Sequence, residues 1–432
     1  FHLSITSRIL SVKIVWNEPS YLNSMEKLNV DYCREQFPAL KQDFIFMDNA
    51  GGSHTLKGVV DRMSEYLLNW DVQHGASYLV SQIATSKVQE SVERLRELIN
   101  AERKEEVIMG SSSTSLLRIL SLCLSHDWEA GDEIIITNSE HEANGSCWTD
   151  LRKKGIVVKY WDVNPDTYEL ELEKLDELLS PKTKLVSVVH ASNILGTINN
   201  VEAIAKRVHE NGSLVCVDGV ALAPHRRVDV RKWDVDFYVY SCYKTFGPHC
   251  GLMYGKYDLL KEMKGINHHF LEDSVPYKFQ PGNLNYEMTY GMAGVCDYLL
   301  DVAKVHNTGF TSNSEAYEHA FEIFAEYEEM LTVRLMDYLT SKENIRVIGK
   351  ASADKDERVA TIAFVSGNRD SREIVTAMDA YQIGIRFGDF YAKEIIKAEG
   401  LTEQNGVVRV SLVHYNTVEE IDRLIAAFEE IL

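Results

Sequence analysis

The chain has 432 residues, and its 45 Lys and Arg against 65 Asp and Glu give a formal net charge of −20 at pH 7. This length predicts two or more domains with a large core, and 45% hydrophobic with 25% charged residues argues against long disorder or a disulfide scaffold. A chain this acidic is repelled by phosphate backbones, which argues against a nucleic acid partner. No run reaches the roughly 18 apolar residues of a membrane span.

The cysteines and residues 1–24 give information about the cellular compartment of the protein. Seven cysteines, an odd number without a CxxC pair, indicate reduced thiols, no metal site and a cytoplasmic protein. Residues 1–24 precede Met25, contain no acidic residue before Glu18, and carry Arg8 and Lys13. We interpret them as a leader or extension outside the folded core; the alternative is an organelle-targeting segment.

From residue 44 onward, short β-branched segments alternate with segments of helical periodicity. Apolar residues recur every three or four positions in 59–70 and 86–100, as in amphipathic helices, and further helical patterns lie at 169–180 and 201–212. The predicted strands are 105–109, 131–138, 155–163, 184–192, 214–220, 236–241 and 251–255. Strands separated by such helices predict an α/β fold with a mostly parallel sheet.

The last third of the chain changes pattern. Residues 286–339 predict long helices, after which strands at 358–365 and 406–413 alternate with helices at 371–382 and 417–432. This order predicts a second, smaller α+β domain. The expected organisation is therefore the leader at 1–24, an N-terminal segment with the large domain at 25–300, and the small domain at 301–432.

Two residues at predicted strand ends point to chemistry. Lys244 lies between a buried strand and a tight Gly-Pro turn in SCYKTFGPHCG, and Asp218 ends the strand LVCVD. A partly desolvated lysine forms Schiff bases with carbonyls, and a carboxylate opposite it keeps the pyridine nitrogen of pyridoxal phosphate protonated. Each residue alone has a plainer interpretation, as a solvated loop lysine and a turn aspartate. The pair together favours a pyridoxal phosphate site.

Six motifs carry a wider resemblance. They are MDNAGGS (47–53), EHEANGSCW (140–148), HASNILGTINNV (190–201), VDGVALAPH (217–225), SCYKTFGPHCG (241–251) and VRVSLVHYNTVEEIDRL (408–424). In this order they resemble the class V aminotransferase family of fold-type I pyridoxal phosphate enzymes, which includes cysteine desulfurases, selenocysteine lyases, kynureninases and isopenicillin N epimerases. The resemblance implies a large domain with a mostly parallel seven-stranded sheet, a smaller C-terminal α+β domain, and a homodimer with shared active sites.

The resemblance also implies roles for matching residues. Lys244 would hold the cofactor as a Schiff base, Asp218 would pair with the pyridine nitrogen, and His141 would stack on the ring and take part in proton transfer. Asn193 would hydrogen-bond the phenolic oxygen of the cofactor. Arg409 would grip the substrate carboxylate, for which a planar guanidinium is suited, and Asn49 is the other residue expected at the substrate.

A phosphate site is implied at the segment GSSSTS (110–115), which lies where a strand meets a helix N-terminus that favours anions. A plain Ser/Thr helix cap is an equally good local interpretation. The expected phosphate-binding residues are Ser113, Thr114, Ser241 and Tyr243, together with Asn283 in the loop QPGNLN (280–285), which would reach the neighbouring subunit.

The sequence departs from the family pattern at several positions. Cysteine desulfurases carry a persulfide-forming cysteine in a loop like RTGHHCA, whereas this chain has RFGDFYA (386–392), with Tyr391 at the cysteine position. No cysteine follows Cys296. Ala221 replaces the usual Gln or His beside the cofactor, Tyr243 replaces a His, and Asn283 replaces a Thr. This pattern is most similar to a cysteine desulfurase-like subgroup that lacks the catalytic cysteine.

The expected function follows from the retained and lost residues. The chain is predicted to act on an amino acid through an external aldimine, as a C–S lyase that eliminates the β-thiolate of cysteine or a cysteine derivative without an enzyme persulfide. An aminotransferase or an amino-acid epimerase of the same family is the alternative. A cofactor-binding protein without catalysis is a further alternative, against which the retained Lys244 and Arg409 argue.

Overall fold

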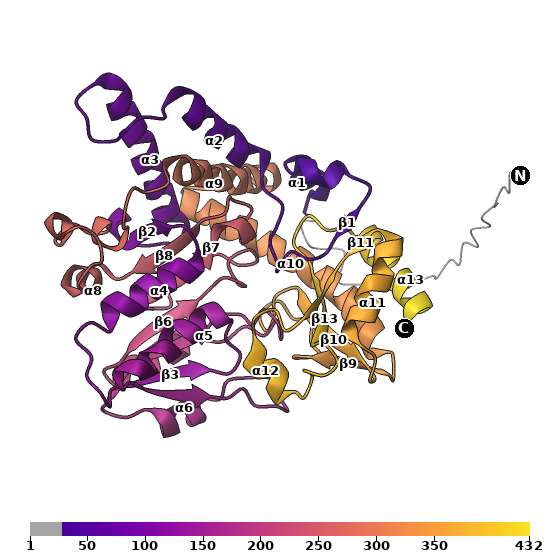
Figure 1. Cartoon of the computed structure of the whole chain (residues 1–432). Helices are drawn as coiled ribbons and strands as arrows, with labels where there is room; N and C mark the ends of the chain where they lie inside the picture. The colour runs from indigo at the N-terminus through magenta and orange to yellow at the C-terminus, as the bar shows by residue number, and fades with distance from the viewer. Residues whose placement is uncertain (1–27) are drawn as a thin grey trace, which may run out of the picture.

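The computed structural model describes residues 28–432 (Figure 1). The predicted leader at 1–24 lies outside the described residues. No helix in the described part is both long and apolar enough to cross a membrane.

A seven-stranded sheet forms the centre of the large domain, in the order β2-β8-β7-β6-β5-β3-β4. Neighbouring strands are parallel except β8, which runs antiparallel to both β2 and β7. The strands are β2 (Val107–Gly110), β3 (Glu133–Thr137), β4 (Val157–Trp161), β5 (Thr183–Val189), β6 (Leu214–Asp218), β7 (Phe237–Ser241) and β8 (Gly251–Gly255). The predicted α/β fold with a mostly parallel seven-stranded sheet is confirmed.

The two faces of this sheet are covered by different helices. Alternate residues of β5, β6 and β7 pack on α7 (Val201–Glu210) and on the long helices of the chain, in the largest apolar cluster. The opposite residues, such as Cys216 and Val239, pack on α4 (Ser113–Leu124) and α5 (Glu142–Thr149). Two short helices add one to each face: α6 (Leu172–Leu178) packs on the side of α7, and α8 (Tyr257–Glu262) packs on the side of α4 and α5. Burial on both faces explains why the strands are continuous apolar runs.

Four long helices lie beside the sheet (Figure 1). They are α2 (Lys57–Asn69), α3 (Leu79–Leu98), α9 (Tyr286–His306) and α10 (Asn313–Thr340). The start of α10 packs in the core of the large domain, and its later residues Leu331 and Leu335 pack in the small-domain core. The domain division expected at residue 300 falls inside α9 and stays a prediction.

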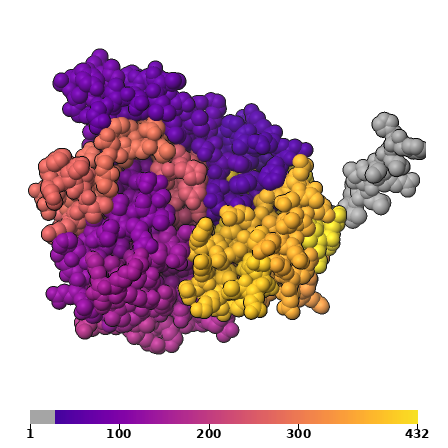
Figure 2. Space-filling view, viewed as in Figure 1, coloured from indigo at the N-terminus to yellow at the C-terminus, as the bar shows by residue number. Residues whose placement is uncertain are grey.

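The C-terminal residues build a second, antiparallel sheet in the order β12-β13-β10-β9. Its strands are β9 (Ile345–Ile348), β10 (Thr361–Ser366), β12 (Arg386–Gly388) and β13 (Val407–Ser411), and its helices are α11 (Ser371–Met378), α12 (Lys393–Ala398) and α13 (Val418–Ile431). The N-terminal segment with α1 (Val30–Glu35) joins this part, because β1 (Ile45–Phe46) pairs in parallel with β11 (Ile383–Gly384). The space-filling view shows the yellow C-terminal region against the indigo N-terminal residues (Figure 2).

Element boundaries were predicted less well than element types. The helix expected at 86–100 begins at Leu79, because its N-cap Tyr78 makes no side-chain cap and gives no start signal. The helix expected at 371–382 ends at Met378 and continues as a short 3-10 turn. Both differences lie at helix ends, where few side-chain contacts fix the boundary.

Candidate active site

Lys244 lies at the carboxyl end of the central strand β7. A short 3-10 turn, Cys242–Lys244, follows the strand, and the backbone N–H of Gly247 donates to the carbonyl of Cys242. The side chain is 8% exposed and its ammonium donates no hydrogen bond to any described residue. Burial, and then the charge of Arg409, lower the pKa of Lys244 to about 8, while Asp218 opposes the shift. A buried amine with a lowered pKa is a competent nucleophile near neutral pH.

Asp218 ends β6, the strand adjacent to β7, so the two residues emerge at the same edge of the sheet. The carboxyl is 2% exposed, and its Oδ1 accepts a hydrogen bond of 2.9 Å from the backbone N–H of Val220. Burial raises the pKa of Asp218 to about 6, and this hydrogen bond and the charge of Lys244 oppose the shift. A cationic partner placed at this carboxyl would therefore be stabilised as an ion pair.

His141 is the N-cap residue of α5. Its Nδ1 accepts a hydrogen bond of 3.1 Å from the backbone N–H of Ala143, which leaves the proton of the neutral ring on Nε2. Burial, followed by the charges of Lys244 and Arg409, lowers the pKa of His141 to about 4. The imidazole is thus neutral at physiological pH, as suits a ring that stacks on another ring.

A group of hydroxyls meets at the N-terminus of α4. The hydroxyls of Ser113 and Ser241 lie 2.8 Å apart, and the Tyr243 hydroxyl is in hydrogen-bonding contact with Ser241. A Cβ on Gly251 would lie 2.6 Å from the backbone N of Ser113, so the glycine allows β8 to approach the helix start. The structure brings together three of the predicted phosphate-binding residues at a helix N-terminus.

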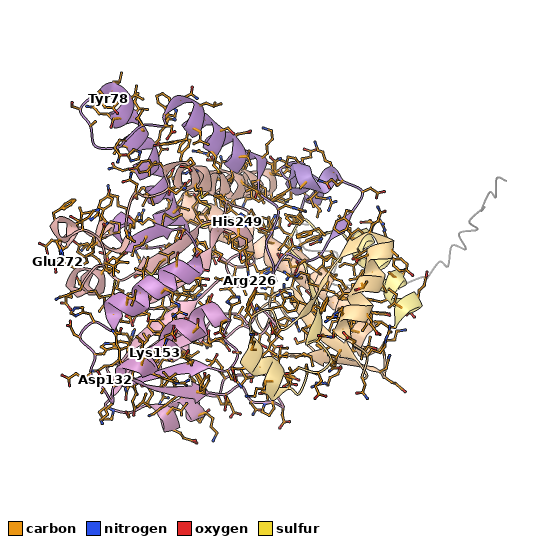
Figure 3. The ribbon with its side chains drawn as sticks, viewed as in Figure 1. Tyr78, Asp132, Lys153, Arg226, His249 and Glu272 are labelled. Atoms are coloured by element: carbon orange, nitrogen blue, oxygen red, sulfur yellow. The ribbon has the colours of Figure 1, made fainter. Side chains whose placement is uncertain are left out.

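The other two predicted phosphate-binding residues lie differently. Thr114 is exposed on the first turn of α4. Asn283 is exposed in the loop before α9, where its Nδ2 donates to Oε1 of Gln73 at 3.3 Å. On the outer side, His249 stacks on the Tyr243 ring with centroids 4.8 Å apart; Figure 3 labels His249 near the middle of the molecule.

Arg409 brings a buried guanidinium from β13 of the small sheet. The residue is 1% exposed, and its Nη2 donates to Oδ1 of Asp48 at 3.1 Å. Its Nη1 donates to the backbone carbonyl of Asn193 at 3.2 Å, and its Nε is buried without a partner among the described residues. Burial lowers the pKa of Arg409 to about 10, so the group stays cationic at neutral pH. The unpaired Nε is a donor available to a bound carboxylate.

Two asparagines were predicted at the site, and the structure places them differently. Asn193 donates from Nδ2 to the carbonyl of Phe390 at 3.0 Å, and its Oδ1 is a buried acceptor without a partner in residues 28–432. Asn49 donates to the carbonyl of Ser411 at 2.8 Å and accepts from the Tyr415 hydroxyl. The amide of Asn49 therefore ties the N-terminal segment to the end of β13, and its role at the substrate stays a prediction.

Sequence reasoning missed the partners of Arg409. Asp48 lies between two guanidinium groups, since its Oδ2 is also 3.6 Å from Nη1 of Arg386. The Phe390 ring covers Arg409, with the guanidinium carbon 3.6 Å from the ring centroid. Asp48 could have been found as the acidic residue of the motif at 47–53, whereas the Phe390 contact depends on tertiary packing.

The loop that contains Phe390 has an unusual backbone. Phe390 and Tyr391 have φ of 48° and 62°, a left-handed conformation that costs a residue with a Cβ about 1–2 kcal/mol. The Tyr391 ring lies beside His141, with centroids 5.4 Å apart. Strain of this kind persists only where the surrounding structure over-determines it, which makes this loop part of the site.

A buried carboxylate supports the residues beneath His141. Glu140 is 7% exposed and accepts hydrogen bonds from the Thr137 hydroxyl, the Asn144 amide and the backbone N–H of Val189. Burial raises the pKa of Glu140 to about 8 against the effect of these donors. The segment at 140–148 is thereby fixed to β5. Among residues 28–432, no cluster of three or more His, Cys, Asp or Glu side chains is arranged to hold a metal ion.

Comparison with known proteins agrees with this geometry. The family profile described as Aminotransferase class-V matches residues 45–424, and the chain belongs to this family. It is 39% identical over 95% of its length to the aminotransferase-like protein FGM3 of Gibberella zeae, all of which is covered. It is 32% identical over 94% of its length to the cysteine desulfurase-like protein ustD of Aspergillus flavus, with 91% of that protein covered.

Solved structures confirm the fold. The cysteine desulfurase CsdA of Escherichia coli, in an S-sulfonic acid form, superimposes with a TM-score of 0.80 at 24% identity, covering 93% of this chain and 98% of that chain. The cysteine desulfurase of Thermococcus onnurineus, in an apo structure, gives a TM-score of 0.82 at 24% identity, covering 94% and 98%. These structures confirm the predicted fold-type I architecture, and the family profile confirms the family assignment.

The cofactor of this family of enzymes is pyridoxal phosphate, and the residues present fit it. Lys244 offers a buried amine without a hydrogen-bond partner in the described chain. Asp218 offers a buried carboxyl, and Ser113 and Ser241 offer paired hydroxyls at a helix N-terminus. Two of the buried polar atoms without partners in residues 28–432, Asn193 Oδ1 and Arg409 Nε, are an acceptor and a donor that a bound group could satisfy. The chain is a pyridoxal phosphate-dependent enzyme.

Proposed function

We propose that this enzyme is a C–S lyase that eliminates the β-thiolate of cysteine or a cysteine derivative without storing sulfur on the protein. The observation that carries the proposal is the loop at 386–392, where Tyr391 occupies the position of the persulfide-forming cysteine. All seven cysteines are buried, and none follows Cys296 in the sequence. A hydrogen bond with Cys250, and then burial, raise the pKa of Cys242, the cysteine nearest Lys244 in the chain, so this thiol is a poor nucleophile.

The cofactor residues are proposed from the contacts above. Lys244 would hold pyridoxal phosphate, Asp218 would pair with the pyridine nitrogen, and the neutral ring of His141 would stack on the cofactor. Asn193 would bind its phenolic oxygen. The hydroxyls of Ser113, Ser241 and Tyr243 would hold the phosphate, with Thr114 on the same helix turn. When bound, the cofactor draws electrons from the α-carbon of an amino acid and so permits bond breaking at that carbon and its neighbour.

The substrate residues act on the amino acid itself. Arg409 binds the α-carboxylate through its unpaired Nε, and the Phe390 ring holds the guanidinium in place from one side. The Lys244 amine takes the proton from the α-carbon, a role for which its lowered pKa is suited. These interactions are common to lyases and aminotransferases, so they define the substrate class as an α-amino acid.

An aminotransferase is the second candidate, because the relative at 39% identity is named aminotransferase-like. Both candidates share the amino acid site and differ in whether the β-substituent leaves. A panel of amino acids that includes cysteine, cystine and cysteine sulfoxides separates them when pyruvate, sulfide, alanine and racemised substrate are assayed in parallel. Sulfide with pyruvate supports the lyase; a keto acid that retains the β-substituent, formed with the amino form of the cofactor, supports the aminotransferase.

We also propose that the enzyme is a cytoplasmic homodimer with shared active sites. Exposed apolar side chains on α2 and α3 support this, since Leu68 is 82% exposed and Leu79 is 70% exposed. Tyr78 lies at the outer end of the same helix pair (Figure 3), and Asn283 lies close enough to bond Gln73 in the connection between these helices. Contiguous exposed apolar residues are typical of an interface. Analytical ultracentrifugation tests the dimer; a monomer at micromolar concentration contradicts it.

A further inference from the structure

We propose that Tyr391 is a catalytic residue that donates its phenolic proton to the sulfur atom as the β-thiolate leaves. The inference rests on the proposed C–S lyase function and deepens it, because it assigns a residue to the step that selects sulfur as the leaving atom. Three features of the loop at 388–392 carry it: a fixed main chain, a position beside the reacting groups, and an unused hydroxyl.

The main chain at Tyr391 is held from both domains. The backbone N–H of Glu142, at the start of α5, donates to the Tyr391 carbonyl at 2.7 Å. The backbone N–H of Tyr391 donates to Oδ1 of Asp389 at 2.9 Å, and the preceding carbonyl accepts from Asn193 at 3.0 Å. These hydrogen bonds hold two successive aromatic residues in the left-handed conformation. A loop fixed in this way keeps its side chains at the site and is not suited to carrying a group away from it.

The position of the ring relates it to the substrate. Phe390 packs on Arg409, which binds the α-carboxylate, while the next residue turns to the opposite side and places the Tyr391 ring 5.4 Å from the His141 ring. Arg409 and Lys244 act electrostatically on His141, and Tyr391 lies beside His141, so the four side chains belong to one region of the molecule. With the carboxylate at Arg409 and the amine on the Lys244 side, the β-substituent is the part of the substrate left to meet Tyr391.

The hydroxyl of Tyr391 is available for this contact. It makes no hydrogen bond to the described chain, and the residue is 63% exposed although its main chain is fixed. His141 and Arg409 are poorer proton donors. His141 is neutral, with a pKa of about 4, and its Nδ1 is already an acceptor for Ala143. Arg409 remains a cation and does not give up a proton at neutral pH.

In the proposed step, proton transfer from Tyr391 accompanies the loss of the thiolate. The Lys244 amine takes the α-proton, the electron pair of the Cα–H bond forms the double bond to Cβ, and the Cβ–S bond breaks with its electron pair on sulfur. The phenolic proton of Tyr391 moves to sulfur, and the phenolate is reprotonated from water. The products are a thiol, or hydrogen sulfide from cysteine itself, and an enamine that water converts to pyruvate and ammonia. No oxidant or reductant is required.

The test compares two leaving groups in the Tyr391→Phe variant, which keeps the ring and removes only the hydroxyl. With cysteine as substrate, sulfide release should fall by about 10²- to 10⁴-fold, the usual contribution of a general acid. With β-chloroalanine, whose chloride leaves without a proton, pyruvate formation should change by less than about 3-fold, because no acid catalysis is lost. Tyr391→His, which keeps a donor and tolerates positive φ, should recover part of the loss with cysteine.

Two further measurements separate chemistry from structure. Alanine, which has no leaving group, should perturb the visible absorbance of Tyr391→Phe at the same concentration as in the wild-type enzyme, and the thermal unfolding midpoint should be unchanged. Tyr160→Phe, a substitution on the edge strand β4, is the matched control and should leave both activities unchanged. Equal losses on cysteine and β-chloroalanine, or no loss on cysteine, overturn the proposal. A wild-type enzyme that releases no thiol or sulfide from any cysteine derivative contradicts the C–S lyase proposal and removes the basis of this one.

Discussion

Two loops of this enzyme meet at one site, and their conformations are fixed by different interactions. The loop at 241–251 follows β7 in the middle of a buried sheet, and its lysine is fixed by strand position and by a tight turn. The loop at 386–392 joins β12 of the small sheet to α12, and hydrogen bonds to the large domain hold it in a strained backbone. The first loop supplies residues that match the family motifs, and we propose that the second loop determines what leaves from the substrate.

The largest effect is expected in the first loop. Lys244→Ala should lower turnover by more than about 10³-fold, because one side chain serves as nucleophile and as base. It should also abolish the visible absorbance that pyridoxal phosphate acquires on the wild-type protein. Visible absorbance in this variant would contradict the role of Lys244, since the cofactor would then be held by another lysine. The control is Lys278→Ala, at the only other lysine that is buried in residues 28–432.

The next largest effect is expected at Arg409, the residue on which Phe390 of the second loop packs. Arg409→Lys keeps the charge but loses the planar fork and the stacking on Phe390, so KM for the amino acid should rise about 100-fold, as for a lost charged hydrogen bond of about 2–3 kcal/mol. Steady-state kinetics measures this rise in KM, and kcat should change less than KM. Arg346→Lys on β9, where the side chain is half exposed beside Glu399, is the matched control and should change KM by less than about 2-fold.

The pH dependence of cofactor binding tests whether the pKa of Lys244 is lowered. The free amine is the reactive form, and the pKa of Lys244 is lowered to about 8. The rate at which apoenzyme captures pyridoxal phosphate should therefore rise with pH, by about 100-fold between pH 6 and pH 9, and level off above it. Stopped-flow absorbance measures this rate. A rate that still rises steeply between pH 9 and pH 10.5 would show that Lys244 has an ordinary pKa.

A smaller effect is expected from the stacking contact. Phe390→Leu removes the ring from Arg409 and should raise KM by about 5- to 30-fold, which corresponds to a cation–π contact of about 1–2 kcal/mol. Phe387→Leu in the preceding strand β12 is the control, because its ring lies under Arg372 instead. Equal KM values for the two variants would show that the second loop does not position the guanidinium.

Much of the fold and part of the site could be predicted from the sequence. The buried strands were found because both faces of the sheet are covered, which makes the strands apolar runs, and Lys244 and Asp218 were found because they follow such runs. The short strands β1, β9, β11 and β12 were missed, since two to four residues carry too little of a period. The contacts of Arg409 with Asp48 and Phe390 join residues far apart in the chain, and no local pattern reports them.

The left-handed backbone at Phe390 and Tyr391 was also beyond sequence reasoning. Aromatic residues seldom adopt positive φ, and the loop has its only glycine at Gly388, where φ is 136°. The conformation results from tertiary hydrogen bonds, above all those from Glu142 and Asn193. The sequence showed that the family's cysteine is replaced at Tyr391, but the structure was needed to place the new side chain beside His141.

The most direct test of the central claim is the product balance of a single turnover with cysteine, together with the mass of the intact protein measured without reductant. The account predicts sulfide and pyruvate in equal amounts, no alanine, and a protein of unchanged mass. Alanine with one sulfur atom bound to the protein would contradict it, because that result requires a persulfide that this chain has no exposed cysteine to form.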